Sequence, residues 1–311
     1  MLTRITLAFA AALIVAVTVS PAQTKEAYYV APNQSPDVLA AEAEVVVLGK
    51  VTEIEKDAVE ATPYAGAPKE QKLSYKIVVL KIDAALIGGQ GLTQIRVGFS
   101  ADALVGGIEE QDCLIRRGGR RGYSGGGAVA LTAGQEGCFF LTPHHDGDFY
   151  VMAGNGGPLD KKGEGYAKKL ESVQSLAKAI DHPVAALKVK DVTERFTVAR
   201  FLLQRYQRAR SAQARLGGGK REAIPVDENK LILDLVAELP WVQKDGSPIP
   251  SRSALWALIN PHELGYKPPM FPPQQPGEAP IDYNKIQDET SAKFLKDNEG
   301  KIKIKRYSSG K

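Results

Sequence analysis

Between residues 44 and 152, apolar and polar side chains alternate with a period of two, which predicts β-strands. An interior glycine, Gly49, predicts a bend in the first strand. The Asp146–Gly147 pair predicts a tight turn between the last two strands. Residues 84–89 end in two glycines and are predicted as a loop or a short turn of helix. The expected strands are residues 45–54, 72–82, 93–99, 137–142 and 148–152.

After residue 154 the period changes to that of helices, with apolar residues three and four apart. Asp191 and Glu194 form a capping-box pattern that opens one of these helices. Residues 301–307 alternate basic and apolar side chains, which predicts an edge strand whose lysines deter further pairing. The expected helices are residues 165–180, 191–216, 227–239, 252–259 and 283–298.

Together these patterns predict an α+β fold. Five short strands with one long excursion between the third and the fourth are typical of a small antiparallel OB-like β-barrel. A mostly α-helical C-terminal region follows, in which residues 186–202 resemble one helix pair of a HEAT repeat. The predicted parts are an N-terminal extension (23–37), the barrel (38–153), a helical region (154–265), a Pro-rich linker (266–281), and a C-terminal helix with the basic strand (282–311).

The first 22 residues have the pattern of a secretory signal peptide. Arg4 precedes an uncharged run at residues 5–19, and small residues at 20 and 22 predict cleavage after Ala22. An uncleaved anchor is the alternative, although the run is shorter than the roughly 20 residues that span a membrane. We therefore expect an exported protein, periplasmic or extracellular, that is soluble after cleavage. The composition, with 43% hydrophobic and 24% charged residues, is that of a globular protein and excludes a disordered or multi-span membrane protein.

Export would bring the two cysteines, Cys113 and Cys138, into an oxidising compartment. An even pair in an oxidising compartment favours a disulfide. Two unpaired thiols are the alternative, because sequence does not fix the distance between their Cα atoms.

Two strings invite a catalytic or metal-binding interpretation. His144 and His145 are adjacent, and neighbouring side chains of an extended chain point to opposite faces, so no shared ion is expected. Ser124 lies in a G-x-S-x-G pattern, but the strand before it and the helix after it that a nucleophile elbow requires are replaced by glycine-rich sequence. The sequence therefore predicts no catalytic residues, no metal and no cofactor.

The excursion between the third and fourth strands carries the best candidate for ligand binding. No acidic residue occurs between residues 113 and 135, and guanidinium groups beside an aromatic ring suit phosphate, sulfate or carboxylate groups. A solvated basic loop without a ligand is the alternative. The candidate residues are Arg116, Arg117, Arg120, Arg121 and Tyr123.

A resemblance adds to this interpretation. The strings at residues 43–51, 75–79, 134–141 and 147–151, together with Cys113, resemble the netrin-like OB modules that include the tissue inhibitors of metalloproteinases. The resemblance covers residues 42–153 and implies the same barrel. Those inhibitors present an N-terminal cysteine to the protease zinc, whereas this chain has no cysteine before Cys113, so that mechanism is not implied. The whole chain also resembles secreted proteins of planctomycete-type bacteria, which implies an architecture and no activity.

The function that the sequence favours is an exported, non-catalytic module that binds a protein partner or an anionic envelope polymer. Nucleic acid is not expected as a partner, nor is a membrane span after the leader. One alternative is a cell-envelope hydrolase whose site is assembled from residues distant in sequence. Another is a protease inhibitor that acts through a loop. A pocket with convergent polar groups would favour the enzyme, and a basic rim on the barrel would favour the binding module.

Overall fold

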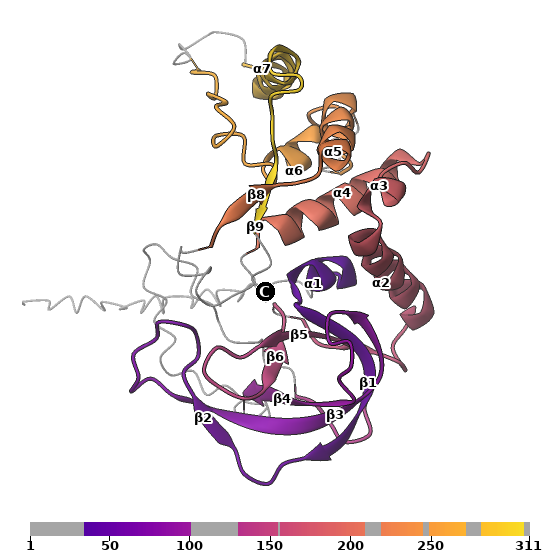
Figure 1. Cartoon of the computed structure of the whole chain (residues 1–311), viewed down its shortest axis with the longest axis vertical. Helices are drawn as coiled ribbons and strands as arrows, with labels where there is room; N and C mark the ends of the chain where they lie inside the picture. Colours follow the sequence, from indigo (N-terminus) through magenta and orange to yellow (C-terminus); the bar gives the residue numbers. More distant parts are fainter. Residues whose placement is uncertain are drawn as a thin grey trace, which may run out of the picture. The chain divides into compact units, whose positions relative to one another are not determined.

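The computed structural model describes residues 34–100, 130–154, 156–208, 219–244, 249–271 and 281–307. The fold is α+β, with a closed five-stranded barrel and several helices (Figure 1). The predicted leader and the arginine-rich excursion lie outside the described residues. The barrel strands are β1 (Val45–Ile54), β3 (Leu73–Ile87), β4 (Gln94–Ser100), β5 (Glu136–Pro143) and β6 (Tyr150–Met152).

The five strands close into a barrel through an unbroken circuit of hydrogen-bonded neighbours. β1 pairs with β3, β3 with β4, β5 with β6, and β5 with β1, all antiparallel. The circuit is completed by a short parallel pairing of β4 with β6. Two additional strands, β2 (Val59–Ala61) and β7 (Leu159–Asp160), pair with β3 and β5. This order is consistent with the OB-like barrel that the sequence predicts.

The long first strand bends where the sequence predicts it. The register of β1 against β3 shifts between Leu48 and Gly49. A Cβ atom at Gly49 would lie 2.4 Å from the Lys81 carbonyl oxygen, so only glycine allows the two backbones to approach here. The bend lets one strand pair with β3 along one edge and with β5 along the other.

The prediction for residues 84–89 is wrong, because β3 continues to Ile87. Ala84 and Ala85 have little β propensity, but they pair with Leu48 and Val47 of β1. Pairing along the barrel circuit therefore overrides the local preference for a turn.

The strand β5 buries both of its faces. Alternate residues of β5, such as Phe139 and Leu141, point into the barrel, whereas Cys138 and Phe140 belong to the core formed with the helices. Burial of both faces explains why residues 137–142 are a nearly continuous apolar run. The barrel interior is filled by Val45, Val47, Val51, Val78, Leu80, Ile95, Val97, Phe99, Leu131, Phe139, Leu141 and Met152.

Seven helices and a two-stranded sheet make up the rest of the described chain. Among the described residues, no helix is long and apolar enough to cross a membrane. The two short strands, β8 and β9, pair antiparallel. The elements are α1 (Pro36–Glu42), α2 (Tyr166–Asp181), α3 (Pro183–Ala186), α4 (Val192–Tyr206), β8 (Arg221–Ala223), α5 (Val226–Glu238), α6 (Arg252–Trp256), α7 (Tyr283–Asp297) and β9 (Lys305–Tyr307).

Most of the predicted helices are present, with three differences. The Asp191 side chain accepts a hydrogen bond from the Glu194 backbone N–H, which confirms the cap of α4, but this helix ends at Tyr206 rather than residue 216. The helix α6 ends at Trp256 rather than residue 259. Residues 186–202 contain only one helix longer than a turn, since α3 ends at Ala186, so this segment is not itself a helix pair.

The short helix α1 was not predicted, and α4 explains how it is held. Leu39, Ala40 and Ala41 of α1 are buried in the core shared by the barrel and the helices. Arg205, at the end of α4, donates hydrogen bonds of 2.9 Å to the carbonyl oxygens of Ala40 and Ala43. These carbonyls at the end of α1 have no partner within the helix, so the buried guanidinium satisfies them.

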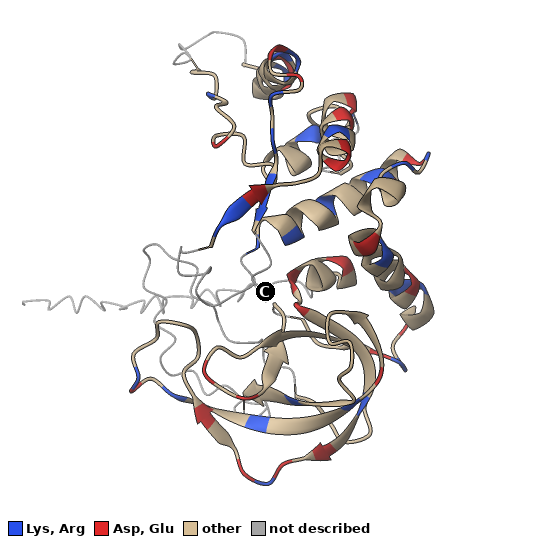
Figure 2. Ribbon diagram, viewed as in Figure 1, with Lys and Arg blue, Asp and Glu red and all other residues tan. Residues whose placement is uncertain are grey.

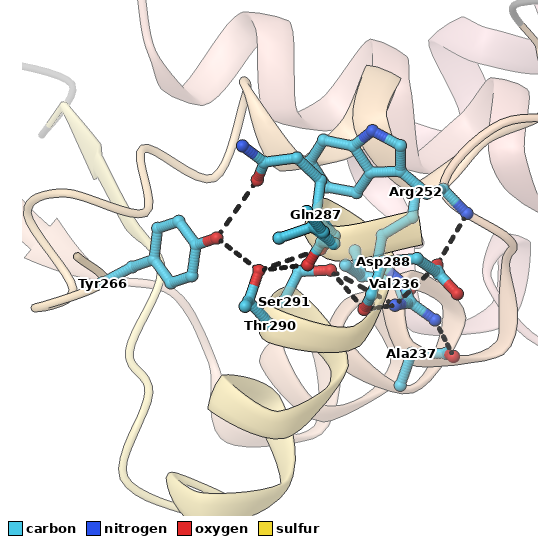
Figure 3. A network of polar contacts seen from close by, with 10 residues as sticks. Val236, Ala237, Arg252, Tyr266, Gln287, Asp288, Thr290 and Ser291 are labelled. Atoms are coloured by element: carbon cyan, nitrogen blue, oxygen red, sulfur yellow. Dashed lines mark hydrogen bonds and ion pairs between the residues drawn. The ribbon is translucent and has the colours of Figure 1, made fainter. Parts of the chain in front are cut away.

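A second buried arginine joins α5, α6 and α7 (Figure 3). Arg252 donates from Nε to the Val236 carbonyl at 2.9 Å and from Nη2 to the Ala237 carbonyl at 3.0 Å. Its Nη1 donates to the Asp288 carbonyl at 3.0 Å and lies 3.1 Å from the Asp288 carboxylate. Burial lowers the pKa of Arg252, and the Asp288 charge opposes that shift. One side chain therefore connects three helices.

Candidate functional site

A polar cluster lies where the connection from β1 to β3 meets the β5–β6 hairpin, and we call it the barrel site. Thr62 directly follows β2, and its hydroxyl oxygen lies 2.7 Å from Nε2 of His145 at the hairpin tip. The same hydroxyl is placed to donate to the Asp146 carboxylate at 3.1 Å. Thr62 and His145 are 83 residues apart in sequence, so barrel closure brings them together.

Aromatic rings pack against His144, the neighbour of His145 in this cluster. The His144 ring stacks on Phe149, with centroids 4.5 Å apart, and meets the edge of Tyr75 at 5.2 Å. Tyr75 and Phe149 belong to a small apolar cluster on β3 that is separate from the barrel core. Gly98 of β4 makes room for it, since a Cβ atom there would lie 2.6 Å from the Phe149 ring.

The two adjacent histidines do not point to opposite faces, so that expectation is wrong. The His144 and His145 rings lie 4.4 Å apart, tilted by 36°. The alternation rule applies to an extended strand, and β5 ends at Pro143, one residue before the pair. The hairpin tip therefore places both rings on the same side.

His144 is held in its neutral form. Its side chain is buried, with 9% exposure, and burial lowers the pKa of His144 to about 4, helped by the neighbouring His145. Nδ1 accepts a hydrogen bond of 3.2 Å from the Asp146 backbone N–H, so the ring proton is on Nε2. The Nδ1 lone pair of His144 is therefore engaged by the backbone of the hairpin itself.

Charged groups lie at the hairpin tip and beside it. A hydrogen bond from Thr62 lowers the pKa of Asp146. Arg96 of β4 donates from Nε and Nη2 to both oxygens of Glu55, at 2.7 and 2.8 Å, and this hydrogen bonding lowers the pKa of Glu55. Arg96 also donates to the Asp148 carbonyl at 3.4 Å, which links the pair to the hairpin. The fork is therefore fixed in orientation.

Within the described ranges, no three histidine, cysteine, aspartate or glutamate side chains come close enough to hold a metal ion. The chemistry available at the barrel site is hydrogen bonding and ring stacking, supplied by the threonine, the second histidine, the carboxylates and the arginine fork.

The residues that sequence reasoning selected for anion binding, Arg116, Arg117, Arg120, Arg121 and Tyr123, lie outside the described residues, as does Ser124. Cys113 lies there too, so its disulfide with Cys138 stays a prediction. Cys138 itself is buried in β5, where no other described cysteine pairs with it, and burial raises the pKa of its thiol to about 12.

Sequence analysis identified the hairpin tip but missed Thr62, Glu55 and Arg96. Their signal is weak, because isolated polar residues at strand ends are ordinary. No protein-family model, no curated protein and no solved structure matches this chain. The chemistry of the barrel site is therefore inferred from its own residues.

Proposed function

We propose that this protein is a non-catalytic binding module whose barrel site takes a ligand. The observation that supports this is the convergence of Thr62, His145 and Asp146 over the stacked rings of His144 and Phe149. In OB-folds, ligands bind where the loop after the first strand meets the hairpin between the last two. The barrel site occupies the equivalent position if the barrel is taken as OB-like.

The charges of the site favour an uncharged, hydroxyl-rich ligand such as a saccharide. Asp146 and Asp148 are exposed, and Arg96 is paired with the Glu55 carboxylate, so the hairpin tip presents two carboxylates and no ammonium or guanidinium group of its own. A polyanion would be repelled there. Carboxylates accept hydrogen bonds from hydroxyl groups, while threonine and histidine can both donate and accept.

A glycan array carrying neutral and acidic glycans tests this proposal. The parent protein should be retained by neutral glycans, and the Thr62→Val/Asp146→Asn variant should bind at least roughly ten-fold more weakly, because two hydrogen-bonding groups to the ligand are lost. A matched control, Thr197→Val/Asp234→Asn, changes the same residue types on α4 and α5 and should bind like the parent. No retention of the parent, or equal loss in both variants, would contradict the proposal.

The proposal also includes three features that are predicted from the sequence, which are the leader, the disulfide and the arginine-rich excursion. We propose that the chain is exported through its first 22 residues and that Cys113 pairs with Cys138. The arginines between residues 116 and 121 would then provide a separate contact to a protein partner or an anionic envelope polymer. The resemblance to netrin-like inhibitors supports the assignment of the barrel as OB-like. If the protein inhibits a protease, it would do so through a loop and not through an N-terminal cysteine.

One observation favours a second candidate, a hydrolase. The 2.7 Å separation of Thr62 Oγ1 and His145 Nε2 is the distance between a nucleophile and its general base. In such a reaction the hydroxyl oxygen would attack an ester carbonyl, its proton would pass to His145, and the alcohol would leave. Water would then release the acyl group from Thr62.

The Asp146 carboxylate argues against this second candidate, since it is placed to accept the proton that His145 would have to remove. We therefore expect the parent and a Thr62→Ala variant to hydrolyse p-nitrophenyl acetate at the same slow rate. A Thr62-dependent burst of p-nitrophenol, with an acetyl group on the peptide that contains Thr62, would favour the hydrolase instead.

A further inference from the structure

The segment that leads into β9 presents a row of lysines. Ile302 and Ile304 are buried, at 5% and 1% exposure, whereas Lys301, Lys303 and Lys305 between and beside them are exposed. Lys303 and Lys305 alternate with the buried isoleucines in an extended segment, so their side chains point the same way, about 7 Å apart along the chain, and Lys301 lies in the turn directly before them. Figure 2 shows blue ribbon along this segment from α7 into β9.

The backbone beneath the lysines is fixed by a side chain of α5. Asn229 donates from Nδ2 to the Ile302 carbonyl at 2.9 Å and accepts at Oδ1 from the Ile304 N–H at 2.8 Å. The Ile304 carbonyl accepts from the Ile224 N–H at 3.0 Å. With its polar groups paired and its isoleucines buried, the segment displays the lysines at a constant spacing.

No acidic group neutralises this row within the part of the chain that the structure describes, where none of the three lysine side chains forms a hydrogen bond or ion pair. The nearby Glu222 is paired with Arg306 at 3.1 Å. Lys305 lies opposite Ala223 in the β8–β9 ladder. Protection of a sheet edge accounts for Lys305 but not for the other two lysines, which precede β9.

We propose that Lys301, Lys303 and Lys305 form a binding site for a linear polyanion, which we call the lysine row. Its ligand is a polymer with sulfate, carboxylate or phosphate groups at regular intervals along its length. Each ammonium group acts as a point charge without a directional requirement, so charge spacing selects the ligand. Attraction of this kind is strong at low salt and screened at high salt.

The test uses the full chain and two immobilised probes, heparin for sulfate and poly-glutamate for carboxylate. The triple variant with glutamine at residues 301, 303 and 305 should bind at least one probe roughly 10- to 100-fold more weakly at low salt. The control removes the same charge from scattered exposed lysines. It carries Lys168→Gln, Lys178→Gln and Lys188→Gln.

Two further comparisons isolate the lysine row. The measurement is repeated with serine at Arg116, Arg117, Arg120 and Arg121, so that the arginine-rich excursion does not mask the effect. The Thr62→Val/Asp146→Asn variant should lose no affinity for the probes, which separates this inference from the barrel site. Equal losses in the triple variant and its lysine control, or binding of neither probe by the parent, would overturn the proposal.

Discussion

Replacing Arg252 with methionine is expected to lower the free energy of unfolding by about 3–4 kcal/mol, because the Val236 and Ala237 carbonyl oxygens lose the guanidinium that donates to them. The Val236 and Ala237 carbonyls lie at the end of α5, where the helix itself supplies no donors. Methionine fills similar volume, so the loss measures the hydrogen bonds more than a cavity. Lysine at this position should recover only part of the loss, since one ammonium group cannot reach acceptors on both sides.

Urea denaturation followed by circular dichroism measures this effect. Arg306→Ala is the matched control, because Arg306 also pairs with a carboxylate, Glu222, but 40% of its side chain is exposed. That change should cost less than about 1 kcal/mol, as exposed ion pairs usually do. Equal losses for the two variants would show that Arg252 does not join the three helices as the hydrogen bonds indicate.

The stability of the protein is expected to fall by about 3 kcal/mol between pH 6.5 and pH 4 through His144 alone. Burial holds the folded-state pKa of His144 at about 4, below the ordinary value of 6.5. In this window the unfolded chain binds a proton that the folded chain does not, so stability decreases as the pH falls. Below pH 4 both states are protonated, and this group causes no further loss.

A His144→Phe variant checks this expectation. Phenylalanine keeps the stack on Phe149 and has no proton to bind, so the variant should lose about 3 kcal/mol less than the parent over the same pH range. If His144→Phe and the parent have the same pH dependence, His144 is not buried in its neutral form.

The barrel could be predicted from sequence because its strands carry their own signal. Apolar side chains alternate with others along residues 45–54, whereas residues 137–142 form a nearly continuous apolar run. Each pattern matches the faces that the strand buries in the structure. The extension of β3 to Ile87 could not be predicted, since it depends on pairing with a distant strand. The seven-residue α1 is similarly held by Arg205, more than 160 residues away, rather than by its own periodicity.

The barrel site could be predicted only in part, because it also depends on contacts between segments that are distant in sequence. The pair of histidines stands out in the sequence, but the direction of their rings follows from the end of β5 at Pro143. Thr62 carries no signal by itself, and only closure of the barrel places its hydroxyl beside His145. Contacts between loops distant in sequence leave no periodic pattern to detect.

An NMR titration of the full chain with the tightest-binding soluble glycan from the array tests most directly whether the barrel site binds the ligand. If the glycan binds at the barrel site, the side-chain signals of His145 and His144 should shift and saturate. The indole signals of Trp241 and Trp256, which lie among the helices, should stay unchanged. Shifts of the indole signals with unmoved histidine signals would contradict binding at this site.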